Sequence, residues 1–512
     1  MGVIARQSIK GALANYLGVV IGFVITFFVV TRYLSEEEVG LTRVMVDAAM
    51  IFSALAQLGT NSSIVKFFPH FKDDKNNHGL FGLSLLLPMV GFLLVALLFL
   101  IFREPLLTVY GEKSPLVADY FYLLPMLTFF ALYLGVFETN ASVLMRITVP
   151  KIVHEIGLRL FNLAAYLLYG YRIISLDLFV WLFCGGWGLA MLLDLFYLMK
   201  LNHFRWSVLK VDWSFLTRER RREIGRYTMM MTITVLAGNV PYLNSLFLGA
   251  KAGLALTGVY TIAFYIANVV EVPYRSLGAI SRPVIAAAVK EGDWGEVNRL
   301  GRQVSLHQLM VSLLIFYVIW INLDTLFALI PNGEDYRGGA GVVLILGLAK
   351  VLNSSLSIGT DVLNYSRHYA WGLLFIGALT LSALVLNDRL IGTMSINGAA
   401  MATLLSYAIY FTLLLAFLWR RLRVGLFSVA QLKVMTVMVA AFALDMVWRT
   451  WLTPMIATGG LWPMLADALL KTALLASAAA GAMIAWKVSP TVNDIMARML
   501  RRRGANDKSD IR

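Results

Sequence analysis

The chain alternates long apolar stretches with short polar ones, and this pattern dominates the whole sequence. A membrane-spanning helix needs about 20 predominantly apolar residues, and lipid admits only helices or closed barrels. The pattern therefore predicts an all-α integral membrane protein of about 14 transmembrane helices. Their approximate limits are 11–31, 39–64, 80–102, 115–142, 152–170, 174–199, 227–249, 253–278, 304–329, 339–363, 370–387, 393–418, 431–451 and 462–486.

The longest polar interval, residues 200–226, separates the first six spans from the next six. Its eight basic residues predict a cytoplasmic linker, because Lys and Arg are retained on the side where insertion begins. Two readings stay open for this linker: a solvated loop that fixes orientation, or a segment that also binds anionic lipid. The predicted organisation is an N-terminal lobe, the linker, a C-terminal lobe, a helix pair and a basic cytoplasmic tail. These parts are 1–199, 200–226, 227–424, 425–488 and 489–512.

Charge distribution sets the predicted topology. With the N-terminus inside, most of the 44 Lys and Arg residues fall in cytoplasmic segments and few in outer loops. The even number of spans also places the C-terminus, with its basic cluster, in the cytoplasm. The first apolar segment is too long for the apolar region of a cleaved signal. We therefore expect a multi-pass protein of a bacterial inner membrane with both termini cytoplasmic.

Composition excludes several classes of protein. A mean hydropathy of +0.73, with 59% hydrophobic and 14% charged residues, excludes an ordinary soluble domain. The net charge of +14 lies in short loops between apolar runs, so it indicates topology and not a nucleic-acid partner. The single cysteine, Cys184, excludes an intrachain disulfide and a cysteine metal cluster. We expect no cofactor and no metal.

The two halves have the character of repeats. The second span opens with EEEVGLTRVMVDAAM and the eighth with LTGVYTIAFYIANVV, which places Gly40 and Gly258 at matching positions. Parallel repeats of this kind are typical of transporters, whose substrate path lies between the halves. Between the eighth and ninth spans, residues 284–303 show helical periodicity with mixed charge. We expect that segment to lie along the membrane interface.

Several of these stretches resemble one superfamily, the multidrug/oligosaccharidyl-lipid/polysaccharide exporters. The most specific is SINGAAMATLLSYAIYF, from Ser395 to Phe411, which is similar to a Gly-Ala-Ala-x-Ala-Thr-x-x-Ser-Tyr stretch of that superfamily. A second is VGLTR in the first half, answered by TGVYTIAFYIANVVEVPYRSLGAISRP in the second. A third is the order of the spans, two six-helix lobes and a trailing pair, as in the polysaccharide and peptidoglycan-precursor flippases.

The resemblance implies a V-shaped molecule that alternates access to a central cavity and turns an undecaprenyl-pyrophosphate-linked glycan to the outer leaflet. Implied partners are that lipid-linked oligosaccharide, membrane lipids, and a glycan polymerase and glycosyltransferases. The chain departs from the superfamily in one place. Where many relatives carry an acidic residue, the seventh span has Asn239 and Asn244, which puts a cation site there in doubt.

Ionisable residues inside the spans are the candidate site residues, because each costs about 2.5–3.5 kcal/mol to insert. Most occur as opposite charges four residues apart, which stacks them on one helix face. These couples are Arg43 with Asp47, Glu155 with Arg159, Glu271 with Arg275, Asp445 with Arg449, and Asp467 with Lys471. Two readings stay open: the couples lower the cost of insertion, or their Arg members exchange a carboxylate for a substrate phosphate.

Lys350 differs because its own helix offers no acidic residue three or four positions away. We expect it to bind a substrate anion or to pair across helices with Glu138, which is also unpaired on its own helix. Asp361 and Asp194 lie nearer the cytoplasmic surface, where they can reach water. The predicted substrate-binding residues are Lys350, Arg159, Arg275 and Arg43. The predicted coupling or charge-balancing residues are Glu138, Glu155, Asp47, Glu271 and Asp361.

Two alternatives to a flippase remain. One is a drug/cation antiporter of the same superfamily, although basic residues in the spans suit an anionic ligand better. The other is a membrane glycosyltransferase or glycan polymerase, which would normally have a large outer loop with acidic groups. The sequence has no Gly-rich phosphate loop, and Leu158 stands where a zinc-protease motif beginning at His154 needs its second histidine. We therefore expect a protein that is not an enzyme.

Overall fold

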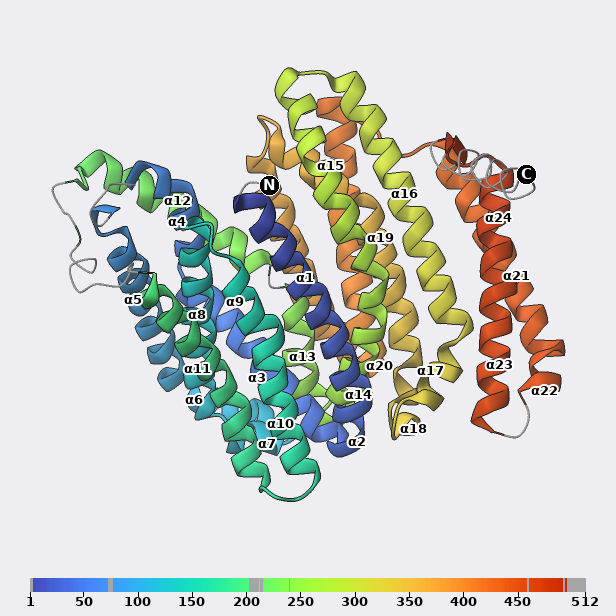
Figure 1. Cartoon of the computed structure of the whole chain (residues 1–512), viewed down its shortest axis with the longest axis horizontal. Helices are drawn as coiled ribbons and strands as arrows, with labels where there is room; N and C mark the ends of the chain where they lie inside the picture. Colours follow the sequence, from blue (N-terminus) through green and yellow to red (C-terminus); the bar gives the residue numbers. More distant parts are fainter. Residues whose placement is uncertain are drawn as a thin grey trace, which may run out of the picture. The chain divides into compact units, whose positions relative to one another are not determined.

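The computed structural model describes residues 3–71, 77–201, 211, 215–238, 240–457, 460–490 and 493–494. Side chains are described at these positions except 3–12, 236–238, 240–241, 275–276 and 279–280. Throughout the described residues, every regular element is a helix, as Figure 1 shows. The predicted all-α class is therefore confirmed.

Within the described ranges, eleven helical stretches are long and apolar enough to cross a membrane. They are Leu13–Tyr33, Glu36–Ala56, Asn77–Ile101, Leu123–Val143, Leu176–Lys200, Leu254–Tyr274, Trp294–Ile321, Gly333–Tyr365, Ala370–Leu422, Val429–Ile456 and Leu461–Ala485. The stretch Ala370–Leu422 holds α20 (Ala370–Phe417), which leaves the helical conformation at Ser395 (φ 51°, ψ −131°). Two helices therefore meet at Ser395, near the start of the predicted twelfth span. The described residues of the predicted fifth and seventh spans are also helical, and the total of fourteen crossings stays a prediction.

Contacts between residues divide the chain into two units. The first unit comprises 1–262, 330–336 and 383–399, and the second comprises 263–329, 337–382 and 400–512. These contact-based units are not the two lobes and helix pair expected from the spans, and that division stays a prediction.

The first unit is built around α3 (Glu36–Ala56), which packs against α5, α8 and α13. Next to it, α11 packs against α8 and α10. Its other helices follow in chain order: α1 (Val3–Val24), η1 (Ile25–Val30), α2 (Thr31–Tyr33), α4 (Thr60–Phe71), η2 (Asn77–Gly79), α5 (Leu80–Ile101), α6 (Arg103–Gly111), α7 (Pro115–Asp119), α8 (Leu123–Val143), α9 (Thr148–Ile152), η3 (Val153–Gly157), α10 (Leu158–Gly170), α11 (Leu176–Lys200), α12 (Arg218–Gly238), α13 (Val240–Lys251), the first part of α14 (Leu254–Asn268) and α18 (Gly333–Tyr336).

Both ends of α3 follow from local sequence. Ser35 caps its start in a capping box, accepting from the backbone N–H of Glu38, while the Glu38 carboxylate accepts from the backbone N–H of Ser35. The helix ends at Ala56, because Leu58 (φ 48°) and Gly59 (φ 68°) adopt the left-handed conformation. The predicted single span 39–64 is therefore wrong at its end: α4 begins as a separate helix.

The matching glycines Gly40 and Gly258 lie where the first turns of α3 and α14 meet. A methyl group on Gly40 would overlap the backbone carbonyl of Leu254, the first residue of α14. A methyl group on Gly258 would overlap the backbone carbonyl of Glu36, the first residue of α3. Each glycine thus makes room for the start of the other helix, which is the arrangement expected of two related halves.

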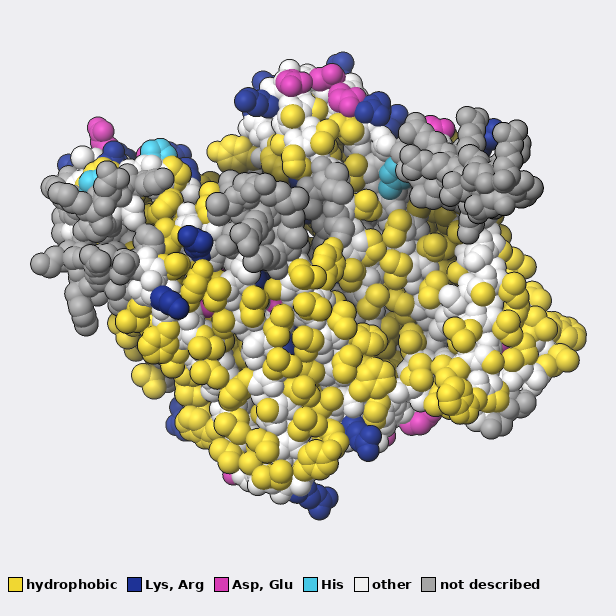
Figure 2. Space-filling view, in the orientation of Figure 1, with side chains coloured by type: hydrophobic (Ala, Val, Ile, Leu, Met, Phe, Trp, Pro, Cys, Tyr) yellow, Lys and Arg dark blue, Asp and Glu magenta, His cyan; other side chains and the backbone are white. Residues whose placement is uncertain are grey.

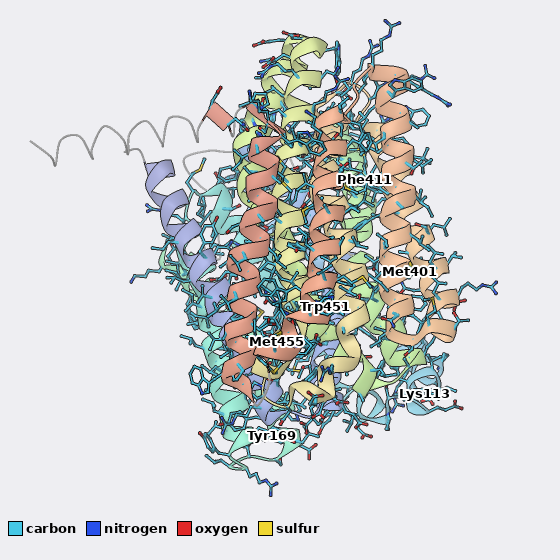
Figure 3. The ribbon with its side chains drawn as sticks, turned by 90° about the vertical axis from the view of Figure 1, so that its right-hand side faces the viewer. Lys113, Tyr169, Met401, Phe411, Trp451 and Met455 are labelled. Atoms are coloured by element: carbon cyan, nitrogen blue, oxygen red, sulfur yellow. The ribbon has the colours of Figure 1, made fainter. Side chains whose placement is uncertain are left out.

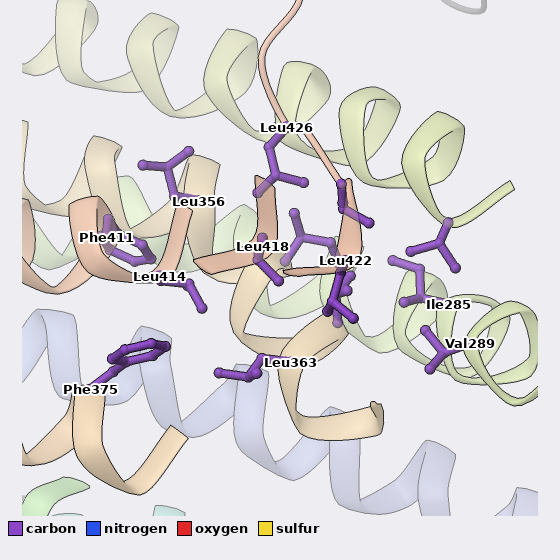
Figure 4. Close-up of a cluster of buried hydrophobic side chains, with 14 of the residues drawn as sticks. Ile285, Val289, Leu356, Leu363, Phe375, Phe411, Leu414, Leu418, Leu422 and Leu426 are labelled. Atoms are coloured by element: carbon purple, nitrogen blue, oxygen red, sulfur yellow. The ribbon is translucent and has the colours of Figure 1, made fainter. Parts of the chain in front are cut away.

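The second unit has its own hydrophobic core, formed by α15, α16, α19, α20 and η7. Figure 4 shows its side chains converging, among them Ile285, Leu356, Phe375, Phe411 and Leu418. The helices of this unit are η5 (Val269–Glu271), α15 (Val272–Glu291), α16 (Trp294–Ile321), α17 (Leu323–Leu329), η6 (Arg337–Gly339), α19 (Ala340–Tyr365), most of α20, η7 (Leu418–Leu422), α21 (Val429–Trp451), α22 (Thr453–Ile456), α23 (Leu461–Lys471), η8 (Thr472–Ala476) and α24 (Ser477–Ala485).

The segment 284–303 is not one continuous helix, and its expected position along the membrane interface stays a prediction. It contains the end of α15, a left-handed turn at Gly292 (φ 75°), and the start of α16, which Asp293 caps. Figure 2 shows charged side chains gathered at this turn, with hydrophobic ones along the helices below. Large apolar side chains also face outward on α21 and α22. Figure 3 labels Trp451 and Met455, which are 72% and 77% exposed, as expected of surfaces that lie in lipid.

Candidate functional site

Charged side chains within the helices of the first unit form close pairs. Arg43 Nε lies 2.6 Å from Asp47 Oδ2, so the predicted couple forms. Ser245 on α13 donates to the same carboxylate oxygen at 2.6 Å. Asp47 is buried and Arg43 is partly buried, and the Asp47 carboxylate joins α3 to α13.

The second predicted couple also forms, with Arg159 Nη2 2.8 Å from Glu155 Oε2. Arg159 Nη1 donates as well to the backbone carbonyl of Gly18 on α1. A methyl group on Gly22 would overlap that guanidinium, so glycines on α1 create the space that Arg159 occupies. Its side chain remains 33% exposed, more than that of Arg43 or Lys350. Among these three cations, Arg159 is the one that a ligand can most readily reach.

Lys350 in α19 is a buried cation of the second unit. Its Nζ lies 3.1 Å from Glu271 Oε2, and Asn353 donates to Glu271 Oε1 at 2.7 Å. The ammonium group also lies 5.3 Å from the ring centre of Phe264, within range of a cation–π interaction. Pairing across helices was predicted correctly. The expected partner was wrong, because Lys350 pairs with Glu271 and not with Glu138.

This pairing gives Glu271 a partner other than Arg275. The side chain of Arg275 lies outside the described residues, and so does Asn239, so both stay predictions. Asn244 is described: it donates to the Tyr260 hydroxyl at 2.6 Å, and Asn387 donates to its amide oxygen at 3.0 Å. Asn244 therefore works as a helix-to-helix contact.

Asp361 does not simply reach water. Arg282 on α15 donates its Nε to Asp361 Oδ2 at 3.2 Å and its Nη2 to the Tyr274 hydroxyl at 2.8 Å. No sequence pattern marks Arg282 as a candidate, because it lies 79 residues from its partner and no helical spacing relates them.

Glu138 belongs to a polar cluster at the junction of α8, η3 and α11. His154 Nδ1 lies 2.6 Å from Glu138 Oε1, and the His154 ring packs edge-on against Trp187 at 5.8 Å. Asp194, one of the residues expected to reach water, interacts electrostatically with Glu138 and His154. It is instead fully buried, and its carboxylate oxygens have no hydrogen-bond partner among the described residues.

The two couples in α21 and α23 also bond to neighbouring groups, and Asp445 Oδ1 is left without a hydrogen-bond partner among the described residues. Arg449 lies 2.8 Å from Asp445 and also donates to the carbonyl of Trp320. Lys471 lies 2.7 Å from Asp467, which accepts in addition from Trp448 Nε1. These contacts hold helices together, so the structural interpretation of these two couples has direct support.

The described ion pairs supply cations held by carboxylates. Among the described residues, no three His, Cys, Asp or Glu side chains are placed to share a metal ion. An arginine or lysine paired with a carboxylate can exchange that partner for a phosphate, because both ligands present anionic oxygens. Such a site can bind an anionic headgroup and release it again.

Comparison with known proteins places the fold. Residues 4–288 match the family model described as polysaccharide biosynthesis protein. The comparison with curated protein sequences gives no match. Among solved structures, the chain is similar to the lipid II flippase MurJ in an inward closed conformation. That match has a TM-score of 0.70 at 13% identity and covers 94% of this chain and 100% of the other.

The chain is also similar to a multidrug resistance MATE family transporter of the MOP superfamily in two conformations. The inward-facing structure has a TM-score of 0.57 at 16% identity, covering 83% of this chain and 98% of the other. The outward-facing structure has a TM-score of 0.55 at 14% identity, covering 82% and 95%. At these identities, the similarity establishes the fold of the chain.

Proposed function

We propose that this protein, which belongs to the polysaccharide biosynthesis protein family, translocates a lipid-linked oligosaccharide. Residues 4–288, more than half of the chain, match the model of that family, which lies within the multidrug/oligosaccharidyl-lipid/polysaccharide exporters. The substrate would be an undecaprenyl-pyrophosphate-linked repeat unit of an O-antigen, capsule or exopolysaccharide. Transport would proceed by alternating access, from the cytoplasmic to the outer leaflet of a bacterial inner membrane. Glycosyltransferases would supply the substrate and a glycan polymerase would use the product.

The observation that carries this proposal is the contact of Lys350 with Glu271, a carboxylate to which Asn353 also donates. A lysine at 5% exposure within an apolar helix costs free energy to insert, so its charge needs a partner. Glu271 neutralises the ammonium group while no ligand is present. A pyrophosphate offers more charge and more acceptor oxygens than one carboxylate, so it can displace Glu271 from Lys350.

Arg159 and Arg43 are the proposed contacts of the first unit, and Arg275 is a further proposed contact in the second. Arg suits a pyrophosphate because its planar fork meets two phosphate oxygens at once. The carboxylates Glu138, Glu155, Asp47, Glu271 and Asp361 would balance charge when no substrate is bound, or couple transport to an ion.

The test is identification of the lipid retained by the protein after gentle purification. Mass spectrometry of the extract should find a polyprenyl diphosphate carrying sugars, and Lys350→Gln should retain less of it at equal protein yield. Lys471→Gln is the matched control, since Lys471 is equally buried but lies in a couple that also bonds to neighbouring groups. An extract that contains phospholipids and no polyprenyl diphosphate would contradict the proposal.

A specific observation favours a second candidate, a drug/cation antiporter. The buried Asp194 carboxylate, beside Glu138 and without a hydrogen-bond partner among the described residues, can take a cation. If this candidate holds, cells that express the protein should gain resistance to cationic drugs, and Asp194→Asn should remove that resistance. The flippase proposal predicts no change in resistance for either protein.

A further inference from the structure

An apolar groove runs along one face of α12 in the first unit. It has a volume of about 570 Å³ and lies between α12, the turn after α3, and α5. Its lining is almost entirely apolar and includes Leu58, Leu83, Leu87, Ile224, Met229 and Ile233. Two contacts hold α12 against α4 beside it: the Ser63 and Thr228 hydroxyls lie 2.7 Å apart, and Lys66 Nζ lies 3.9 Å from the ring centre of Tyr227.

Residues that line the groove recur at every fourth position along α12. Arg221, Gly225, Met229 and Ile233 all line it, so they form one stripe of the helix. From Arg221 to Ile233 the helix rises about 18 Å. One leaflet of the hydrocarbon core is about 15 Å deep, half of the usual 30 Å. The groove is therefore as long as one extended acyl chain.

Charge lies at one end of this stripe. Arg221 is the one charged residue among the described lining residues, and its guanidinium makes no hydrogen bond or ion pair within the described part of the chain. Arg218, Arg220 and Arg222 lie in the same first turns of α12. Arg220 is engaged elsewhere, bonded to the Phe215 carbonyl and stacked on the Phe215 ring. The Arg221 guanidinium thus lies at one end of the apolar groove, with no partner among the described residues.

We propose that this groove binds one anionic phospholipid of the cytoplasmic leaflet. Its phosphate contacts Arg221 at the basic start of α12, and one acyl chain lies along Gly225 and Met229. A basic cluster at the cytoplasmic end of a membrane helix attracts anionic lipids, and the apolar groove supplies the binding surface for the chain. A polyprenyl chain is much longer than one leaflet is deep, so this groove cannot hold it whole. The inference does not depend on the transported substrate.

Native mass spectrometry of the full-length protein in detergent tests the proposal. Phosphatidylglycerol and phosphatidylcholine with the same acyl chains are added separately, and the apparent affinity for the first bound lipid is measured. We expect the wild type to prefer phosphatidylglycerol about fivefold, the factor that one basic residue at the membrane surface supplies. Arg221→Gln should remove that preference and leave binding of phosphatidylcholine unchanged.

A steric variant separates the groove from the charge. Gly225→Leu has no atoms within 4 Å of its new Cβ, so it fills the groove without displacing backbone and should weaken binding of both lipids. Gly185→Leu is the matched control, because its Cβ also meets nothing within 4 Å and Gly185 does not line the groove. Equal affinity for the two lipids in the wild type would overturn the proposal, as would Gly225→Leu binding lipid like Gly185→Leu. Neither outcome bears on oligosaccharide translocation.

Discussion

Gly40 on α3 lies against the first residue of α14, and Gly258 on α14 lies against the first residue of α3. The two glycines are four residues into α3 and α14, at matching positions of two segments that the sequence suggested were repeats. Close packing at such a point depends on the missing side chain, because a Cβ on either residue would meet a backbone carbonyl that cannot rotate away.

The close packing of α3 against α14 predicts that Gly40→Ala and Gly258→Ala destabilise the protein to a similar extent. Each would cost about 1–3 kcal/mol, the usual penalty for overpacking. The double change should cost less than the sum of the two, because the first methyl group already pushes the helices apart. Thermal unfolding of the purified protein in detergent measures this, with Gly185→Ala as a control that meets no neighbour. Additive effects would show that the two glycines act at separate contacts.

Variants of the Lys350–Glu271 contact distinguish a lysine that binds substrate from a lysine that only balances charge. Lys350→Gln should stop export of the glycan, because the positive charge for the pyrophosphate is lost. If Lys350 only balances Glu271, then the single change strands a buried carboxylate, which costs about 3–5 kcal/mol. The double change Lys350→Gln with Glu271→Gln would then restore function. We expect it to restore stability and not export, measured as surface glycan at matched protein levels.

The control for this experiment is the couple Asp467–Lys471, which has the same charges and similar burial. Asp467→Asn together with Lys471→Gln should leave export close to the wild-type level. If both double variants export glycan normally, Lys350 is a structural charge and the proposed binding role is wrong.

If Asp194 has a role in transport, we expect its substitution to affect stability and export in opposite directions. An unsatisfied buried polar group costs about 1–3 kcal/mol, so Asp194→Asn should leave the thermal midpoint unchanged or raise it. If the carboxylate couples transport to an ion, the same change should lower export. Asp361→Asn is the comparison, because Asp361 has an Arg282 partner and its loss should lower the midpoint. Loss of stability in Asp194→Asn would mean that the carboxylate has a structural partner.

Some of these features follow from the sequence, and the reason is their short range. The couples Arg43–Asp47 and Glu155–Arg159 were predicted because helical spacing alone brings such side chains together. The partner of Lys350 could not be found in this way, since Glu271 lies 79 residues earlier in the chain and packing alone brings the two together. The burial of Asp194 also depends on packing, because its distance from the helix end suggested access to water.

The break after α3 had a local signal that the apolar pattern concealed. Leu58 and Gly59 sit inside a run of membrane-spanning length, so hydropathy continued the span to residue 64. The left-handed conformation of both residues ends the helix at Ala56. Polarity sets where a chain can lie in lipid, and backbone conformation sets where its helices end.

The topology is open to direct labelling, because the one native cysteine, Cys184, is buried. Glu112→Cys and Glu291→Cys introduce accessible thiols in polar turns on predicted opposite sides of the membrane. A membrane-impermeant thiol reagent should label position 112 in intact cells and position 291 only after permeabilisation. The reverse pattern would invert the orientation, and with it the predicted cytoplasmic position of the basic residues 200–226.

Translocation itself is the most direct test of the account. The protein is reconstituted into liposomes that contain a polyprenyl-diphosphate-linked oligosaccharide, and a glycosidase outside reports the fraction of sugar exposed over time. We expect the wild type to expose the inner-leaflet pool, and Lys350→Gln with Glu271→Gln to match protein-free liposomes. A wild-type rate equal to that of protein-free liposomes, with folded protein present in both orientations and any ion gradient supplied, would contradict the proposed function.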